Sequence, residues 1–338
     1  MRASIRTSAP ARHAAMLGIG VYRPRLVVDN DEVAGLIDSS DEWIRTRSGI
    51  ERRRWAGEDE TIVEMATAAA AMAIERSGVD PAGIGCVLLA TISNLKQTPA
   101  AASEVATRVG AVNAGAMDIS AACAGFCYGL ALAGDIVRGG SAETVLVIGV
   151  ERMTDLIDHR DRGTAFLFAD GAGAAVVGRS EEPGIGPVVW GSDGTQGELI
   201  SQDHSWLDWR DQLAKDPSTE APALRMNGQP VFRWATVEMA KVARRTLEAA
   251  GVDVADLGAF IPHQANDRIT QALAKSLRLP PTVAVARDVV EQGNTSAASV
   301  PLAMEALLSS GEARSGDTAL LLGFGAGLSF AGQVVVLP

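Results

Sequence analysis

The feature that most constrains the fold of this chain is an internal duplication. The segment Val63–Thr91 reads VEMATAAAAMAIERSGVDPAGIGCVLLAT, and it is echoed by VEMAKVARRTLEAAGVDVADLGAFIPH in Val237–His263. SAETVLVIG, which begins at Ser141, likewise matches SGDTALLLG, which begins at Ser315, and the offset is the same in both pairs (237 − 63 and 315 − 141). Units of about 170 residues are too long for solenoid repeats, so the chain contains two copies of one larger unit.

Each copy alternates helices and strands. The runs TVLVIG and TALLLG are continuously apolar, which is typical of strands that helices cover on both faces. Amphipathic segments such as residues 236–250 would supply those helices. We therefore expect a duplicated α/β fold, with a flexible tail at residues 1–12 and halves at residues 13–182 and 183–338. Residues 196–222 look like an insertion in the second half, which is either a functional or a disordered loop.

Composition excludes several classes of protein. The chain has 338 residues, of which 47% are hydrophobic, so it can bury a large core. Its formal net charge of -11 argues against a nucleic-acid partner, because phosphates would be repelled by most of the surface. Three cysteines do not make a disulfide framework, which favours a reducing, cytoplasmic location. No apolar run approaches the roughly 18 residues needed to span a bilayer, so we expect no membrane association.

The segment SAACAGFCYGLAL at residues 120–132 indicates a strand, a sharp turn and a helix that begins near Cys123. A thiol at that position lies where free backbone N–H groups and the positive end of the helix dipole stabilise a thiolate. Cys123 is therefore the candidate nucleophile, and the alternative is a buried cysteine that acts as a small hydrophobe. We assign that structural role to Cys86 and Cys127.

Aligning the two copies adds two further candidates. At the offset of the repeat, Asn294 falls on Ser120 (294 − 120), three residues before Cys123, and His263 ends the strand that matches residues 86–91. Open α/β sheets place their sites at the carboxyl ends of strands, so we expect Cys123, His263 and Asn294 to face one pocket. The alternatives are a structural histidine and an asparagine that only forms a turn or an N-cap.

With these three residues in place, the sequence resembles the thiolase superfamily and, within it, the β-ketoacyl-acyl-carrier-protein synthase III family. Six motifs in order carry the resemblance: SSDEWIRTRSGIERR (39–53), AACAGF (121–126), DRGTAFLFADGAGAAVV (161–177), PHQAN (262–266), GNTSAASVPLA (293–303) and GFGAGLSF (323–330). The resemblance implies a thiolase-like α-β-α-β-α layered fold built from two halves that are related by a pseudo-twofold axis.

The resemblance also implies a condensing acyltransferase. Cys123 would take an acyl group from acyl-CoA, and the acyl-enzyme would react with malonyl-acyl-carrier-protein as the latter loses carbon dioxide. His263 and Asn294 would stabilise the enolate of that decarboxylation. The loop of Phe324, Gly325 and Ala326 would supply an oxyanion donor, although Ala326 stands where glycine is common in the family. Such an enzyme needs no cofactor and no metal ion.

For the substrates, the resemblance points to Trp43, Arg47 and Arg162 as residues that bind CoA. Basic residues near the tunnel mouth would dock the acidic carrier protein, and Arg268 and Lys275 are the candidates. In a homodimer, the loop that bears Thr98 would reach the acyl pocket of the partner subunit. Phe232 is a further candidate for that pocket. The nearby arginines 45, 52, 53 and 54 add to a local basic cluster in an acidic chain.

Other functions stay open. A related acyltransferase would move the acyl group to oxygen or sulfur, but such relatives replace the asparagine at the position of Asn294. A non-catalytic partner subunit would lack the nucleophile, so Cys123 counts against it. A cysteine hydrolase would need a base directed at water, which the sequence does not indicate.

Overall fold

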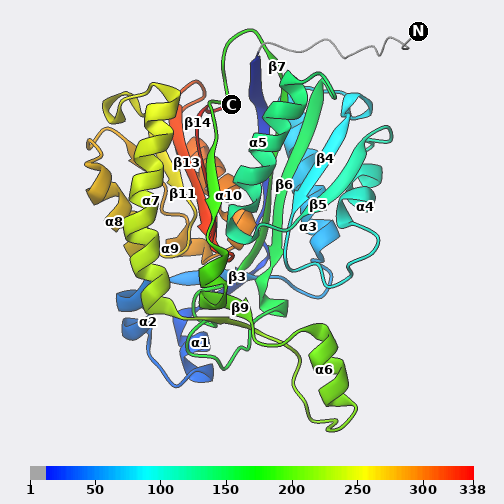
Figure 1. Cartoon of the computed structure of the whole chain (residues 1–338), viewed down its shortest axis with the longest axis vertical. Helices are drawn as coiled ribbons and strands as arrows, with labels where there is room; N and C mark the ends of the chain where they lie inside the picture. The colour runs from blue at the N-terminus through cyan, green and yellow to red at the C-terminus, as the bar shows by residue number, and fades with distance from the viewer. Residues whose placement is uncertain (1–12) are drawn as a thin grey trace.

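Two five-stranded sheets form the framework of the protein (Figure 1). The computed structural model describes residues 13–338, so the predicted tail lies outside the described residues. The first sheet has the order β1 (His13–Tyr22), β7 (Asp170–Ser180), β6 (Thr144–Arg152), β4 (Cys86–Ala90), β5 (Gly115–Ile119). The second has the order β8 (Val189–Ser192), β14 (Ser329–Val336), β13 (Thr318–Gly325), β11 (Ala259–Pro262), β12 (Ala284–Val285).

The two sheets repeat one topology. In the first, β5, β4 and β6 are parallel and β7 and β1 are antiparallel to their neighbours, and in the second the same pattern runs from β12 to β8. Strands β6 and β13 begin at Thr144 and Thr318, which are separated by the offset found in the sequence. The prediction of a duplicated α/β fold is confirmed.

Helices lie between the sheets and outside them, which gives five layers. Helices α5 (Gly125–Arg138) and α10 (Ser299–Ser310) contact strands of both sheets and form the central layer. Outside the first sheet lie α3 (Ile62–Ser77) and α4 (Ala101–Arg108), and outside the second lie α7 (Gly228–Ala250) and α8 (Asp267–Leu277) (Figure 1). Three apolar clusters fill the spaces between these layers.

Matching signals end the matching outer helices. Helix α3 begins after Thr61, whose side chain accepts a hydrogen bond from the Glu64 N–H, and it ends at Gly78 in the left-handed conformation. Helix α7 ends at Gly251, which is also left-handed. Glycine adopts this conformation without the steric penalty of a side chain, so the sequence repeat fixes the same helix end twice.

The remaining elements are short and connect the strands and helices of these layers. They comprise β2 (Leu26–Asp29), α1 (Asn30–Leu36), α2 (Asp41–Ser48), β3 (Arg52–Trp55), α9 (Val289–Gln292) and the short 3-10 turns η1 (Pro81–Gly83), η2 (Ala122–Ala124), η3 (Met153–Asp155), η4 (Gly194–Leu199), η5 (Val254–Asp256) and η6 (Ser296–Ala298). Within residues 13–338, no helix has the length and apolar character needed to cross a membrane.

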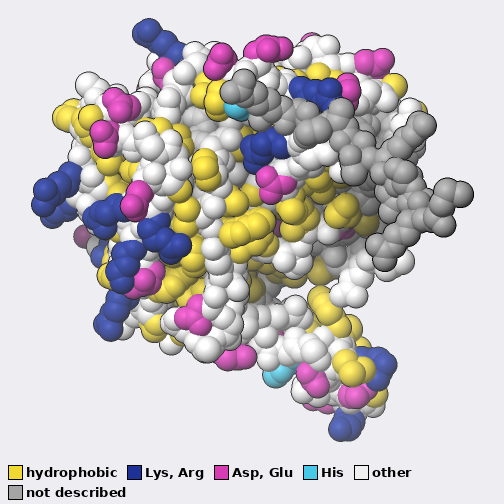
Figure 2. Space-filling model, turned by 45° about the horizontal axis from the view of Figure 1, so that its top comes forward, with side chains coloured by type: hydrophobic (Ala, Val, Ile, Leu, Met, Phe, Trp, Pro, Cys, Tyr) yellow, Lys and Arg dark blue, Asp and Glu magenta, His cyan; other side chains and the backbone are white. Residues whose placement is uncertain are grey.

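The stretch at residues 196–222 has regular structure, although the sequence suggested an irregular loop. Strand β9 (Ile200–Gln202) pairs with β10 (Leu224–Met226), and an arm between them carries α6 (Trp206–Leu213). Figure 2 shows that this arm projects from the body and carries side chains of both charges. Ser205 begins α6 with a capping box that it forms with Asp208, a local signal that the sequence contained.

Candidate active site

Cys123 lies in a tight turn between the first sheet and the central layer. Strand β5 ends at Ile119, and Cys123 occupies the middle of the 3-10 turn η2, directly before α5. The predicted order of strand, sharp turn and helix is therefore observed. The turn is strained at Ala122, whose φ is 44°, a left-handed value that is uncommon for a residue with a side chain.

His263 and Asn294 enter from the second half of the chain. His263 directly follows β11, and its backbone N–H donates a hydrogen bond to the Leu322 carbonyl at 2.7 Å. Asn294 bridges to the first half, because its N–H donates to the Leu167 carbonyl and its carbonyl accepts from the Ala169 N–H, at 2.8 and 2.9 Å. These backbone hydrogen bonds fix the positions from which the two side chains enter the site.

Hydrogen bonds orient both side chains so that they present donors. The Asn294 Oδ1 accepts from the Ser296 N–H at 2.9 Å, which leaves the Nδ2 amide group free to donate. The Ser299 hydroxyl lies 2.7 Å from His263 Nδ1 and accepts from the Gln264 N–H at 3.3 Å. A hydroxyl has one proton and two lone pairs, so this contact fits either tautomer, and we adopt the tautomer in which Ser299 donates to Nδ1. The imidazole proton then resides on Nε2.

Cys123, His263 and Asn294 line one small chamber of about 50 Å³. The loop of Phe324, Gly325 and Ala326 lines the same chamber, and the Phe324 ring packs edge-on against the His263 ring at 5.2 Å between centroids. Most of the other walls are apolar. The structure therefore brings together the three residues that the sequence offset placed at one pocket.

Protonation in the chamber differs from the thiolate that we expected. Burial raises the pKa of Cys123 to about 12, and the negative charge of Glu151 adds to this rise, while hydrogen bonds from Ser296 and two backbone groups oppose it. Burial also lowers the pKa of His263 to about 3. Burial thus favours the uncharged forms of both groups in the free site, a thiol and a neutral imidazole.

Backbone hydrogen bonding at Cys123 and at Ala326 lowers the pKa of the Cys123 thiol, and Ala326 lines the chamber. We therefore expect the N–H groups of these two residues to serve as oxyanion donors. Glycine is required at position 325, because a Cβ atom there would lie 2.7 Å from the Cys123 Cβ and 2.9 Å from its sulfur. The loop after β13 can therefore approach the nucleophile only through Gly325.

A larger cavity of about 840 Å³ leads from the surface to the chamber, and the two share Met226, Val231 and Asn294 among their walls. At its mouth the guanidinium groups of Arg162 and Arg47 lie 4.7 and 5.5 Å from the centre of the Trp43 ring. These contacts are cation–π interactions, and they gather the three predicted CoA-binding residues at one entrance.

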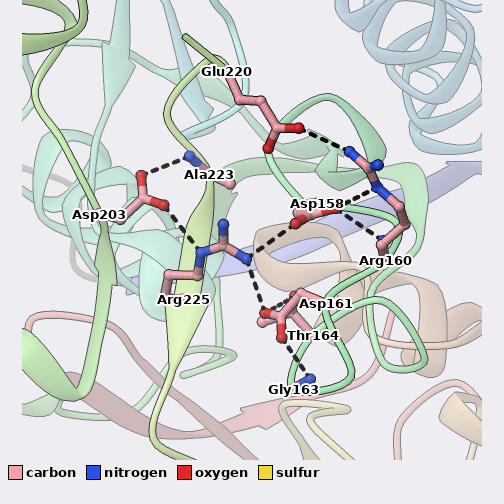
Figure 3. Close-up of polar contacts among 9 residues, drawn as sticks. All are labelled: Asp158, Arg160, Asp161, Gly163, Thr164, Asp203, Glu220, Ala223 and Arg225. Carbon is pink, nitrogen blue, oxygen red and sulfur yellow. Dashed lines mark hydrogen bonds and ion pairs between the residues drawn. The ribbon is translucent and has the colours of Figure 1, made fainter. Parts of the chain in front are cut away.

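A charged network anchors the loop that bears Arg162 (Figure 3). Arg225, on β10, forms ion pairs with three carboxylates at the base of the projecting arm and in that loop: Asp203 at 3.0 Å, Asp158 at 3.4 Å and Asp161 at 3.5 Å. Asp161 in turn accepts a hydrogen bond from the Gly163 N–H at 2.8 Å. Arg225 thereby ties the arm to the backbone on both sides of Arg162.

The basic cluster predicted near Arg47 is largely neutralised. Arg45 pairs with Asp41 and Glu51, Arg52 pairs with Glu291, and Arg54 donates to the Pro24 carbonyl. Arg53 is fully buried and bonds to Asn30 and to two backbone carbonyls, and burial lowers its pKa to about 10. Of the cluster, Arg47 alone lines the entrance cavity.

The remaining predicted residues separate. Arg268 lines the entrance, where its guanidinium lies 5.2 Å from the centre of the Phe232 ring, whereas Lys275 borders a separate surface hollow. Phe232 therefore lines the entrance and does not border the Cys123 chamber. Two residues further along α7, Trp234 lines the chamber instead, because a step of two residues turns a helix by about 200°. Thr98 is exposed and does not border the Cys123 chamber of its own subunit.

Sequence reasoning missed three residues that organise the site. Ser299 and Ser296 hold His263 and Asn294, and both lie in the GNTSAAS motif, so the motif itself was a signal. Glu151 is fully buried behind the chamber. A charged residue that directly follows the apolar run TVLVIGV was the only sign of it.

Comparisons with known proteins agree with this geometry. Residues 117–194 match the family model for 3-oxoacyl-[acyl-carrier-protein] synthase III, and residues 247–337 match the model for its C-terminal part. A β-ketoacyl-[acyl-carrier-protein] synthase III of Streptomyces glaucescens is 55% identical over 334 residues, which cover 99% of both chains. The chain belongs to the β-ketoacyl-acyl-carrier-protein synthase III family. It is thus an acyltransferase-type condensing enzyme with the thiolase fold.

Two further matches support membership of the synthase III family. A β-ketoacyl-[acyl-carrier-protein] synthase III 1 of Streptomyces coelicolor is 56% identical over 340 residues, with 99% of both chains covered. The crystal structure of the priming β-ketosynthase from the R1128 polyketide pathway superposes with a TM-score of 0.95, at 51% identity and with 99% of both chains covered.

Proposed function

We propose that this synthase III family member loads an acyl group from acyl-CoA onto Cys123 and joins it to malonyl-acyl-carrier-protein with loss of carbon dioxide. The product is a 3-ketoacyl-carrier-protein, which starts a fatty acid or polyketide chain. The observation that carries the proposal is the arrangement of a thiol, an imidazole Nε2–H and an amide Nδ2 around one enclosed chamber.

In the first half-reaction the Cys123 sulfur attacks the thioester carbonyl. The backbone N–H groups of Cys123 and Ala326 stabilise the negative oxygen of the tetrahedral intermediate, and the position of Ala326 on the chamber wall supports this role. Each such donor contributes about 10²–10³ in rate in enzymes of this kind. The enclosed chamber limits the access of water, which favours transfer to the second substrate over hydrolysis.

In the second half-reaction the malonyl thioester loses carbon dioxide and becomes an enolate. The Nε2–H of His263 and the amide of Asn294 donate hydrogen bonds to the enolate oxygen. Neutral imidazole suits this role, because it donates through Nε2 while Nδ1 is engaged by Ser299. The carbanion then attacks the acyl group on Cys123.

The entrance cavity suits a long thioester substrate that carries phosphates. Trp43 offers an aromatic face to the adenine, and Arg47 and Arg162 offer guanidinium groups to adenine and phosphate. Arg268, at the same mouth, is the residue we propose for docking the acidic carrier protein. Lys275 lies away from this mouth, so we do not assign it to the same contact.

A homodimer fits the edge of the first sheet that is unpaired within residues 13–338. Strand β5 is an edge strand, and Met117 on it and Val112 before it have exposed fractions of 49% and 72%. An unpaired edge with exposed apolar side chains favours pairing with a second copy.

In that dimer the Thr98 loop would help to close the acyl pocket of the partner subunit. A cavity of about 510 Å³, which shares Ile92, Ala122 and Ala326 with the chamber, is our candidate for this pocket.

The test is to follow the intact mass of the protein with a series of acyl-CoAs and then add malonyl-acyl-carrier-protein. We expect an acyl adduct on Cys123 and a ketoacyl product that requires the malonyl substrate. Transfer of the acyl group to an alcohol or thiol without malonyl-acyl-carrier-protein would support the non-condensing alternative. Release of free acid would indicate a hydrolase, and the absence of any adduct would indicate a non-catalytic subunit.

A further inference from the structure

Glu151, near the end of β6, is a fully buried carboxylate that the reaction described above does not use. Five hydrogen bonds reach it, and all of them come from uncharged donors: Thr91 Oγ1 (3.1 Å), Ile92 N (3.1 Å), Ser93 N (3.1 Å), Ser93 Oγ (2.5 Å) and Ser296 Oγ (3.1 Å). Burying a carboxylate without a cationic partner is costly, so the presence of this group behind the chamber calls for a reason.

The two oxygens of Glu151 bind groups from different halves of the chain. Oε2 accepts the four hydrogen bonds from residues 91–93, which follow β4 in the first half. Oε1 accepts the remaining one from the hydroxyl of Ser296, which begins η6 in the second half. An ionised carboxylate is an acceptor only, so both of its oxygens suit these donors. Glu151 therefore links the end of β4 to η6.

The backbone of Ser296 is strained, which explains why it needs such a link. Its φ is 47°, a left-handed value that is uncommon for a residue with a side chain. The corresponding residue of the first half is Ala122, with a φ of 44°, and there the backbone of Gly325 packs directly against the adjacent Cys123. Glu151 is the counterpart of Gly325 in the repeat (325 − 151 and 296 − 122). At this point the second turn is therefore supported by a hydrogen bond instead of backbone packing.

The conformation of Ser296 determines how both proposed enolate donors are held. Its backbone N–H donates to Asn294 Oδ1 at 2.9 Å, and this bond decides which end of the amide faces the chamber. Its carbonyl accepts from the Ser299 N–H, and the Ser299 hydroxyl lies 2.7 Å from His263 Nδ1. If the turn relaxed at Ser296, the amide of Asn294 would lose the donor that fixes it and would be free to present its oxygen to the enolate.

We infer that Glu151 is a positioning residue for the decarboxylation step, and that it acts by holding Ser296 in the conformation that orients Asn294 and Ser299. The inference rests on the proposed function. Among the described residues, the walls of the chamber include Ser296 but not Glu151, so the carboxylate acts on the substrate only through other side chains. It exchanges no proton and forms no covalent bond in this role.

This role predicts a separation of the two half-reactions. Acylation depends on Cys123 and on the loop after β13, whereas decarboxylation depends on the two side chains that η6 holds. Weakening the bond between Glu151 and Ser296 should therefore slow the release of carbon dioxide from malonyl-acyl-carrier-protein. The formation of the acyl adduct on Cys123 should stay at the wild-type rate.

Two substitutions of Ser296 give the sharpest test, because both remove the hydroxyl but only one removes the strain. In Ser296→Ala the steric penalty stays and the bond to Glu151 is lost, so the turn should relax. We expect decarboxylation to slow by about tenfold or more, up to the roughly 10²–10³ that a lost donor costs. Glycine adopts a left-handed φ without penalty, so Ser296→Gly should decarboxylate nearly as fast as wild type.

Glu151→Gln tests the carboxylate itself. The amide oxygen keeps the four donors of residues 91–93, and the amide NH₂ group then faces Ser296, so a charge-assisted hydrogen bond becomes a neutral one that is about half as strong. Decarboxylation should fall between the rates of wild type and Ser296→Ala, with normal acylation. Glu60→Gln, at a buried carboxylate that bonds to Tyr22 and Arg25, is the matched control and should leave both half-reactions unchanged.

The double variant Glu151→Gln/Ser296→Gly shows whether Glu151 acts through Ser296. Once glycine has removed the strain, the loss of the carboxylate should cost nothing more, so the double variant should decarboxylate as fast as Ser296→Gly. This comparison decides the matter even if Ser296→Ala does not fold.

Carbon dioxide release and intact mass with acyl-CoA measure the two half-reactions on the same preparations. Equal defects in Ser296→Ala and Ser296→Gly would mean that the hydroxyl itself contacts the substrate, and this result would overturn the inference. Normal decarboxylation in Ser296→Ala would also overturn it, as would a parallel loss of both half-reactions in Glu151→Gln. Wild-type protein that forms no acyl adduct or releases no carbon dioxide would instead overturn the proposed function.

Discussion

The two halves of the chain build the same turn at the same place but use it differently. In the first half η2 carries Cys123 and precedes α5, and in the second half η6 carries Ala297 at the corresponding position and precedes α10. Both turns are strained at corresponding residues, with a φ of 44° at Ala122 and 47° at Ser296. Duplication thus supplied two equivalent turns, and the nucleophile occupies one of them.

The strands that pack against these turns, β13 against η2 and β6 against η6, also differ in a complementary way. Glu151 on β6 corresponds to Gly325 on β13, because the two are separated by the offset of the repeat (325 − 151). Gly325 has no side chain because the Cys123 side chain packs there, while Glu151 extends a carboxylate toward Ser296 of the opposite half. The comparison teaches that each half supplies what the other lacks, so the site exists only at the junction of the two.

Removing the sulfur should have the largest effect. Cys123→Ala makes the two turns alike, and we expect no acyl adduct with any acyl-CoA because no other thiol lines the chamber within residues 13–338. Intact mass measures this directly. Cys86→Ala, which alters a buried cysteine on β4, is the control and should still bind one acyl group. An adduct on Cys123→Ala would show that the halves do not divide the work as described.

Adding a side chain at Gly325, where the backbone lies against Cys123, should have the next largest effect. In Gly325→Ala the new Cβ would lie 2.7 Å from the Cys123 Cβ, so either the sulfur or the Ala326 N–H must move. Loss of one oxyanion donor costs about 10²–10³ in rate, and we expect acylation to slow by that factor. Gly83→Ala, where a Cβ meets no atom within 4 Å, is the control. A normal acylation rate in Gly325→Ala would contradict the packing argument.

The halves also differ in the loop that follows β4 in the first half and β11 in the second. This difference predicts a smaller effect, on the choice of acyl group. After β4 the chain forms an exposed loop that contains Thr98, whereas β11 is followed almost at once by α8. Each buried methylene contributes about 0.8 kcal/mol, so two or three should change the preferred primer more than tenfold if the pocket is open. We expect wild-type protein to accept acyl groups longer than acetyl, and Thr98→Phe to shift the preference toward acetyl-CoA.

Relative acylation rates across straight and branched acyl-CoAs measure this shift. Cys123 should stay reactive toward acetyl-CoA in Thr98→Phe, which separates a change in pocket depth from a damaged site. If wild-type protein strongly prefers acetyl-CoA, or if the variant keeps the wild-type profile, another residue sets the depth of the pocket.

The smallest effect concerns stability and pH. His263 follows β11 and is buried, and its pKa is about 3 in the folded protein against about 6.5 when unfolded. Between these values the unfolded chain binds more protons, so His263 makes the folded state less stable as pH falls from 6.5 toward 3. Between pH 7.5 and pH 5.5 the loss is about 1.4 kcal/mol in the free energy of unfolding.

Urea unfolding at pH 7.5 and pH 5.5 tests this effect. In His263→Asn the pH dependence should be smaller than in wild type by about that amount, while His204→Asn, at an exposed histidine, should leave it unchanged. An equal pH dependence in His263→Asn and wild type would mean that protonation of this buried ring does not limit stability.

The sequence predicted the parts of the site that follow from symmetry. The alignment of the two copies placed Asn294 beside the Cys123 turn and His263 at a matching strand end, because a repeated topology puts equivalent positions around one axis. It could not show that burial raises the pKa of Cys123, since desolvation depends on the surrounding packing. It also could not show that Arg53 is buried while Arg47 is exposed, or that Phe232 faces the entrance, because these depend on which side of an element faces its neighbours.

The central claim is that the first half binds the acyl group and the second half drives the decarboxylation. The most direct measurement is the release of carbon dioxide from malonyl-acyl-carrier-protein by Asn294→Asp, next to the formation of its acyl-enzyme. This variant keeps an oxygen for the Ser296 N–H and removes the amide donor. The account predicts a normal acyl adduct on Cys123 and decarboxylation that is slower by about 10²–10³. Normal decarboxylation in this variant, or the loss of its acyl adduct, would contradict the account.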